Sequence, residues 1–164
     1  MKHHPFNPVE KIRDLKELTD LSTKKFADKD AYLIMTGRDS CKGVTYRRFG
    51  EELTALANAL IARGLTGARM ALVGENSYEW VLSYFSIVNT NSTAVPLDKE
   101  LTAEELRAFV LRAGATVLFV SPTYAEEAQI ILNAVPGLLV VSLDEKFGSA
   151  LPLSELIAEG SALL

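Results

Sequence analysis

The residues best suited to chemistry follow a short apolar stretch and read "GEN": Gly74, Glu75 and Asn76. If that stretch is a strand, these residues stand at its carboxyl end, where open α/β sheets bind ligands. Backbone N–H groups at the start of the following helix can also hold an anion. A second interpretation is structural, because Gly74 permits a tight turn and Asn76 with Glu79 has the spacing of a helix-capping pair. Capping accounts for these residue types, and a ligand contact is the alternative.

Aromatic side chains continue the same segment at helical spacing. Trp80, Tyr84 and Phe85 can line an apolar pocket, but residues of this kind are more often packed in a core. We therefore favour a core role for this aromatic group. If a substrate pocket is present, its rim is expected to consist of Gly74, Glu75, Asn76, Trp80 and Tyr84.

Cysteine and histidine offer little further chemistry. Cys41 is the single cysteine, so no internal disulfide can form, and we expect a reducing, cytoplasmic compartment. A catalytic cysteine needs a positioned base, and the only histidines are His3 and His4. Two adjacent histidines without further ligands do not predict a metal site. We therefore assign no catalytic and no metal-binding residue.

Asp98 follows the apolar letters "VPL" and is a second carboxylate at a strand end. A receiver domain also has an acidic residue at such a place, but it needs an acidic pair after its first strand and a lysine after its last. Lys146 is poorly placed for that role, and analogy of fold alone is a weak argument for function. We expect Asp98 to be a solvated turn residue.

Recognised phosphate and cofactor motifs do not occur in this chain. The patterns G-x-x-x-x-G-K-[ST], G-x-G-x-x-G, G-x-S-x-G and H-E-x-x-H are all missing. The sequence therefore predicts no cofactor-binding residue.

Composition limits the classes of function. The chain has 164 residues, of which 48% are hydrophobic, and 17 basic against 21 acidic side chains give a net charge of -4. This content predicts a folded core. The charges are interspersed, and without a basic stripe we expect no nucleic-acid partner. No signal peptide is visible, and no apolar run approaches the ~20 residues of a membrane span.

The first third of the chain predicts a helix, a hairpin and a second helix. Residues 7–27 are expected to be helical, with Asn7 as the cap and Pro8 in the first turn. Strands 31–35 and 43–46 flank the turn "GRDS". Thr45 is placed to cap a helix over 46–63, whose inward face is predicted to hold Tyr46, Phe49, Leu53, Leu56, Leu60 and Ile61.

Residues 69–143 alternate apolar strands with helices and predict β-α-β-α-β-α-β. The strands are 69–73, 93–97, 116–121 and 138–143, and this alternation is typical of a largely parallel sheet with flanking helices. Thr102 and Glu105 form a capping box for the helix with inward residues Leu106, Phe109, Val110 and Ala113, and Gly114 ends that helix. Ser121 and Pro122 are expected to start the next one. We expect an α/β fold, with 1–30 as an N-terminal helical segment and 31–164 as an α/β subdomain.

Several motifs in this order resemble the N-terminal part of AMP-forming adenylating enzymes, and most closely the fatty-acyl-CoA ligase branch. The similarity covers most of residues 14–143. The similarity rests on these motifs: Thr45-Tyr46, Gly74-Glu75-Asn76, Glu79-Trp80, Val95 to Asp98, Thr102 to Leu106, and the strand after Gly114. One departure is "NTNST" where the family usually has glycine. Asn91 tolerates a left-handed backbone and can keep that turn.

The resemblance implies the first subdomain of a larger AMP-binding domain. The whole enzyme would activate a carboxylic acid, by this resemblance a fatty acid, with ATP and magnesium. It would then transfer the acyl group from an acyl-adenylate to coenzyme A. The family's phosphate-binding loop and its later catalytic groups would follow residue 164. The resemblance therefore implies that this chain needs the rest of its own polypeptide as a partner, and that it is catalytically incomplete and carries no cofactor alone.

Two alternatives stay open from the sequence. The chain could be a stand-alone α/β binding or regulatory domain on a ligase scaffold. It could also be an assembly module, since an uncovered apolar face drives association, and a homodimer is then expected.

Overall fold

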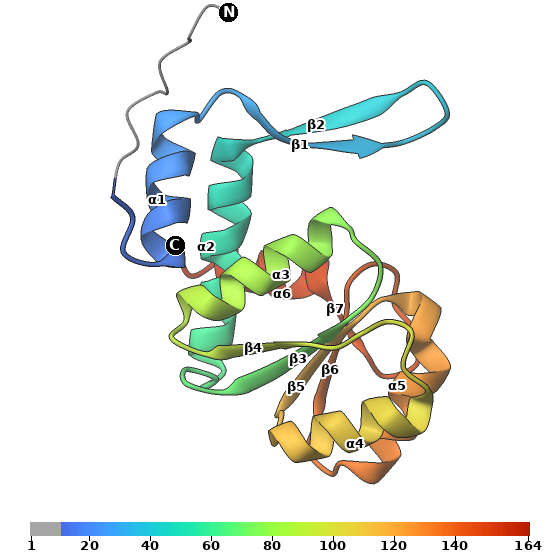
Figure 1. Cartoon of the computed structure of the whole chain (residues 1–164). Helices are drawn as coiled ribbons and strands as arrows, with labels where there is room; N and C mark the ends of the chain where they lie inside the picture. The colour runs from blue at the N-terminus through green and yellow to red at the C-terminus, as the bar shows by residue number, and fades with distance from the viewer. Residues whose placement is uncertain (1–10) are drawn as a thin grey trace, which may run out of the picture.

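The computed structural model describes residues 11–164, which form fourteen helices and strands (Figure 1). The strands are arranged in two sheets. In chain order these are α1 Leu15–Lys25, β1 Asp30–Met35, β2 Cys41–Thr45, α2 Tyr46–Ala62, β3 Arg69–Val73, α3 Tyr78–Asn89, β4 Thr93–Pro96, α4 Ala103–Ala113, β5 Val117–Val120, η1 Pro122–Tyr124, α5 Ala125–Ala134, β6 Leu139–Ser142, β7 Leu151–Pro152 and α6 Leu153–Ser161.

A parallel sheet of five strands forms the centre of the molecule, in the order β4-β3-β5-β6-β7. Strand β5 is buried along its whole length, because helices cover both faces of a parallel sheet. The predicted α/β class and the β-α-β-α-β-α-β series are confirmed. Strand β7 was missed, since two residues are too few to show a period.

Helices α2, α3 and α6 cover one face of the sheet, and α4 and α5 cover the other (Figure 1). Successive side chains of a strand point to opposite faces, so β3 serves both layers. Met70 and Leu72 pack under the first group of helices, whereas Ala71 and Val73 pack under the second. The result is a three-layer arrangement in which the carboxyl ends of the parallel strands all lie at one edge of the sheet.

Two of the predicted helix caps, Thr45 and Thr102, are confirmed, and the other predicted helix starts need correction. Thr45 caps α2 by accepting from the Arg48 amide at 3.2 Å, and Thr102 and Glu105 form the predicted capping box. Helix α3, however, is capped by Ser77, whose Oγ accepts from the Trp80 amide at 3.1 Å. Asn76 therefore lies one position before the cap, because Ser77 is the residue with the extended backbone of a cap.

Helix α1 begins at Leu15, later than predicted, because Asp14 caps it by accepting from the Glu17 amide at 2.8 Å. The predicted start at Asn7 and Pro8 lies outside the described residues, as do His3 and His4. After β5, Ser121 makes no side-chain cap, and Pro122 starts a short 3-10 turn that leads into α5.

Two residues predicted to point inward are exposed. Ile61 is 49% exposed and Phe109 is 42% exposed. The inward line of α2 ends at Leu60, and a step of one residue turns the side chain by about 100°. In α4, Leu106 and Val110 are buried and occupy the line that faces the sheet, which leaves Phe109 on the flank. The turn at Asn91 is confirmed, with a left-handed φ of 58°.

Candidate functional site

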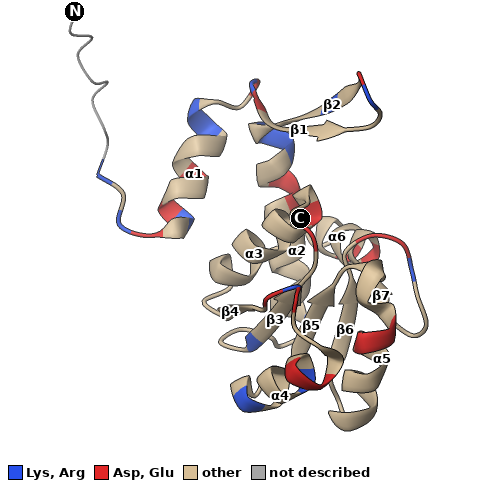
Figure 2. Cartoon of the chain, turned by 45° about the vertical axis from the view of Figure 1, so that its right-hand side comes forward, with Lys and Arg blue, Asp and Glu red and all other residues tan. Residues whose placement is uncertain are grey.

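The loops that leave β3, β5 and β6 meet at the carboxyl edge of the sheet and enclose a pocket of about 310 Å³. Parallel strands bring their carboxyl ends to the same edge, so three separate sequence segments converge there. The lining residues are Glu75, Ser77, Glu79, Ser121, Pro122, Thr123, Leu143, Asp144 and Glu145. In Figure 2, some of the loops that border the sheet carry red, acidic segments.

Gly74 and Glu75 have distinct roles at this edge. A Cβ on Gly74 would come to 2.9 Å from the Ser121 Cβ, so only glycine allows the two loops to approach this closely. Glu75 is exposed, and the Ser121 hydroxyl donates to its carboxylate, which holds the pKa of Glu75 below its usual range. Glu75 is therefore a charged acceptor at the rim of this pocket.

The other three predicted rim residues lie elsewhere. Asn76 and Trp80 line a groove of about 600 Å³ between β1 and the start of α3. The ring of Tyr84 stacks on Trp80, with 5.8 Å between the ring centroids and planes 5° apart. Trp80 and Tyr84 are half-buried. The five residues therefore surround the start of α3 and do not converge on one cavity.

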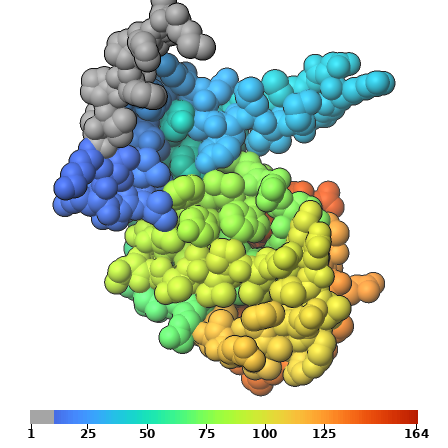
Figure 3. Space-filling view, in the orientation of Figure 1, coloured from blue at the N-terminus to red at the C-terminus, as the bar shows by residue number. Residues whose placement is uncertain are grey.

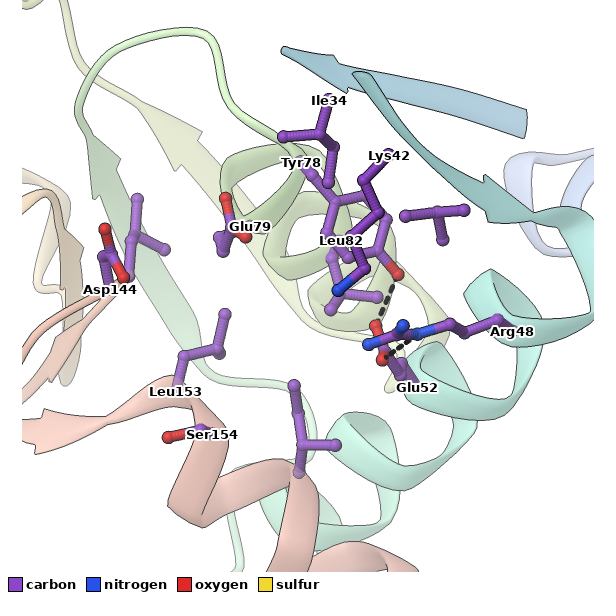
Figure 4. Close-up of a pocket in the computed structure, with 13 residues that line it drawn as sticks. Ile34, Lys42, Arg48, Glu52, Tyr78, Glu79, Leu82, Asp144, Leu153 and Ser154 are labelled. Atoms are coloured by element: carbon purple, nitrogen blue, oxygen red, sulfur yellow. Dashed lines mark hydrogen bonds and ion pairs between the residues drawn. The ribbon is translucent and has the colours of Figure 1, made fainter. Parts of the chain in front are cut away.

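A second pocket of about 320 Å³ lies beside the first and contains a hydrogen-bonded triad (Figure 4). The Tyr78 hydroxyl donates to Glu52 Oε2 at 2.5 Å, and Arg48 Nε donates to Glu52 Oε1 at 2.8 Å. Figure 4 shows these three side chains meeting between α2 and the start of α3, with Lys42 of the hairpin above them. Asp144 and Glu79 line the side shared with the first pocket.

The triad holds the start of α3 against α2 and does not act as an acid–base pair. Burial, followed by the hydrogen bond to Glu52, raises the pKa of Tyr78 far above its ordinary value, so the phenol stays neutral and remains a donor. Both carboxylate oxygens of Glu52 are engaged. Sequence reasoning missed this triad, because only the helical i,i+4 spacing of Arg48 and Glu52 was visible and Tyr78 lies 26 residues from Glu52.

The pocket at the sheet edge does not fit the phosphates of ATP or coenzyme A. Four of its lining residues are carboxylates and none is lysine or arginine, whereas phosphate groups need cationic side chains or convergent backbone N–H groups. The neighbouring pocket is lined by Arg48, which is paired with Glu52, and by Lys42. Within residues 11–164, no group of three or more potential ligands could hold a metal ion. Asp98 is exposed and accepts from the Glu100 amide at 2.9 Å, as expected of a turn residue.

The family of AMP-binding enzymes matches residues 20–159. The chain is 29% identical over 112 residues to a fatty acid–[acyl-carrier-protein] ligase of Streptomyces coeruleorubidus. It is 28% identical over 138 residues to the human mitochondrial medium-chain acyl-CoA ligase. These matches cover 66% and 72% of this chain but only 21% and 22% of the relatives, so the chain spans about a fifth of their length.

Solved structures share the fold of this chain. A crystal structure of an anthranilate CoA ligase with anthranoyl-AMP superimposes with a TM-score of 0.78 at 25% identity, covering 89% of this chain and 28% of that one. A long-chain-fatty-acid CoA ligase of Archaeoglobus fulgidus gives 0.77 at 21% identity, over 89% and 30%. Among residues 11–164 no helix is long and apolar enough to cross a bilayer.

Proposed function

This chain belongs to the family of AMP-binding enzymes, and from that premise we propose that it is the N-terminal scaffold of an adenylate-forming acyl-CoA ligase. The complete unit would use ATP and magnesium to convert a carboxylic acid into an acyl-adenylate and then transfer the acyl group to coenzyme A. Residues 31–164 would form the first subdomain of its AMP-binding domain. The family match over residues 20–159 is the observation that carries this proposal.

The acid is proposed to be a fatty acid. The support comes from two relatives whose names state fatty and medium-chain acyl substrates. Within this chain, Glu75 at the edge pocket and the stacked rings of Trp80 and Tyr84 would lie beside the bound acid. Gly74 would keep the loops at the sheet edge close, and Asn76 would stand at the mouth of the groove. A free, exposed Cys41 accords with a reducing cytoplasm.

The chain alone is proposed to be catalytically incomplete. Stabilising the charge of a reacting phosphate requires aimed N–H donors, cations or a metal ion. The edge pocket presents Glu75, Glu79, Asp144 and Glu145 instead, and like charge repels a polyphosphate. The residues described here would therefore position and shape the site, while the groups that bind the nucleotide would come from the remainder of the unit.

An ATP–pyrophosphate exchange assay tests this proposal. We expect no exchange above the buffer blank when the purified 164-residue chain is given ATP, Mg²⁺ and octanoate or palmitate. A sequenced transcript should continue in frame into a Ser/Thr/Gly-rich loop followed by a lysine. Exchange by the chain alone would contradict the incompleteness, and a transcript with a stop codon after Leu164 would contradict the scaffold role.

The alternative is a stand-alone module that assembles with itself. It is supported by two large apolar side chains of the hairpin, Leu33 and Met35, which are 62% and 67% exposed. Light scattering separates the two proposals, since a homodimer would have twice the 17.9 kDa of one chain.

A further inference from the structure

A positive charge lies on the inward face of the hairpin of β1 and β2. Lys42 pairs with Ile34 across the hairpin, and Val44 pairs with Tyr32 on the same face. The three apolar or aromatic partners pack against the core, which identifies this face as the inward one. Figure 3 shows the surface hollowed beneath the projecting hairpin. Lys42 lines the pocket of about 320 Å³ that holds the hydrogen-bonded triad, and we call this cavity the hairpin pocket.

Two carboxylates line the hairpin pocket on the side away from this cation. Glu79 belongs to the first turn of α3, and Asp144 to the loop that follows β6. Figure 4 shows the Lys42 ammonium on one side of the pocket and the two carboxylates on the other. Among residues 11–164, the side chains of these three residues take part in no hydrogen bond or ion pair. All three charges are therefore available to a ligand.

The triad does not compensate the charge of Lys42. Glu52 accepts from Arg48 through one oxygen and from Tyr78 through the other. The ion pair with Arg48 balances the negative charge of Glu52, and Tyr78 stays neutral. One side of the hairpin pocket thus carries a net positive charge from Lys42, and the opposite side carries two negative charges.

The wall between the two charged sides is apolar. Leu82, Leu143 and Leu153 line the hairpin pocket with buried side chains, and Ile157 lines it half-buried. Ligand pockets in proteins have volumes of about 300–1,000 Å³. The hairpin pocket lies at the lower end of this range and has room for one small molecule.

This distribution of charge discriminates between classes of ligand. Glu79 and Asp144 repel a polyphosphate, and Lys42 repels a simple amine. A molecule with an ammonium group at one end, a carboxylate at the other and methylene groups between them complements all three parts of the pocket. An ω-amino acid has this form, whereas an α-amino acid carries its two charges on neighbouring atoms.

We propose that the hairpin pocket binds a small zwitterion of the ω-amino acid class. Its ammonium group lies at Glu79 and Asp144, its carboxylate at Lys42, and its methylene groups on Leu82 and Leu153. The bound molecule bridges β2, α3 and the loop after β6, three segments that are distant in the sequence. This ligand is distinct from the acid that the complete unit would adenylate, so the inference does not rest on the proposed function.

Titration of the ¹⁵N-labelled 164-residue chain at pH 7, followed by NMR, tests the proposal with four probes. We expect 6-aminohexanoate to bind with a Kd on the order of a millimolar and to shift amides of β2, the start of α3 and the loop after β6. Hexanoate, hexylamine and glycine should each bind roughly three- to fivefold more weakly, the upper range for the loss of one exposed ion pair. Equal affinity for 6-aminohexanoate and the singly charged probes would overturn the inference, as would shifts confined to other segments.

Variants assign the two charged ends separately. Lys42→Gln should weaken the binding of hexanoate roughly threefold and leave that of hexylamine unreduced, whereas Glu79→Gln should do the opposite. Asp144→Asn tests the carboxylate side again without changing α3. Glu145→Gln is the matched control, because Glu145 lines the edge pocket and not the hairpin pocket.

The amide spectrum of each variant also shows whether the chain is folded. If Lys42→Gln and Asp144→Asn weakened both probes equally or neither of them, the assignment of the two ends would be wrong. A loss of affinity in Glu145→Gln as large as that in Asp144→Asn would place the ligand in the edge pocket and overturn the proposal. Because the titration involves no nucleotide, its outcome is independent of the ATP–pyrophosphate exchange assay.

Discussion

At the scale of single residues, the most constrained group of the candidate site is the Tyr78 hydroxyl. It is half-buried and donates to Glu52, which Arg48 also binds. Removal from water disfavours the phenolate, and the neighbouring carboxylate disfavours it further. This group ties α3 to α2 and also makes the stability of the fold sensitive to alkaline pH.

Tyr78→Phe should lower the free energy of unfolding by about 1 kcal/mol at pH 8, the usual net value of one hydrogen bond. Because the folded pKa of Tyr78 is raised, the unfolded chain releases its proton first, near pH 10. The stabilising contribution is therefore complete below pH 10 and is lost as the pH rises further. Urea denaturation from pH 8 to 11 should show the difference in free energy of unfolding between wild type and Tyr78→Phe becoming smaller as the pH rises.

Tyr84→Phe is the control, since it keeps the ring that stacks on Trp80. A difference between wild type and Tyr78→Phe that stays constant up to pH 11 would contradict the assignment.

At the scale of elements, the start of α3 joins the two pockets and the groove. Ser77 lines both the edge pocket and the groove, and Glu79 lines all three cavities. The cap at Ser77 fixes where the first turn begins, and so it fixes the directions of Tyr78 and Trp80. A shift of the cap by one residue would rotate each of these side chains out of its place.

Ser77→Ala should destabilise the chain by about 1 kcal/mol, because the Trp80 amide loses its acceptor. Asn76→Ala, the matched control one residue earlier, should change the free energy of unfolding by less than about 0.5 kcal/mol. Thermal and urea denaturation measure both. If Asn76→Ala were more destabilising than Ser77→Ala, Asn76 and not Ser77 would be the cap.

At the scale of the whole molecule, α6 closes the face of the sheet that also carries α2 and α3. Leu153 and Leu156 of α6 belong to the same core cluster as Leu56 and Leu60 of α2. The two helices lie so close that Gly160 rests directly on the α2 backbone. Arg63 and Glu159 join the outer ends of the pair at 2.7 Å. This packing holds the last helix of the described chain against α2, the second helix in the chain.

Gly160→Ala should therefore be severely destabilising. Its Cβ would come to 1.7 Å from the Ala55 carbonyl oxygen, and backbone cannot move aside as a side chain can. We expect a loss of roughly 2–4 kcal/mol, at the upper end for overpacking. Gly37→Ala is the control, because its Cβ would meet only the Ser40 hydroxyl, the end of an exposed side chain. Equal denaturation midpoints for the two variants would refute the close packing of α2 and α6.

Local features of this protein could be read from the sequence because neighbouring residues determine them. The capping box of Thr102 and Glu105, the left-handed turn at Asn91, the helix end at Gly114 and the continuous apolar run of β5 were all predicted and are confirmed. Caps, turns and strand periods depend on residues a few positions apart. The order of such segments also identified the family.

Only the tertiary structure decided which distant residues meet. Tyr78 and Glu52 are 26 residues apart, and Arg63 and Glu159 are 96 apart, so no periodicity could pair them. Of the predicted rim residues, Glu75 lines the edge pocket and Asn76 and Trp80 line the groove beside β1, because these two cavities lie on different sides of the start of α3. The exposure of Leu33 and Met35 on the β1–β2 hairpin likewise became visible only in the folded chain, because strand register and burial are properties of the tertiary structure.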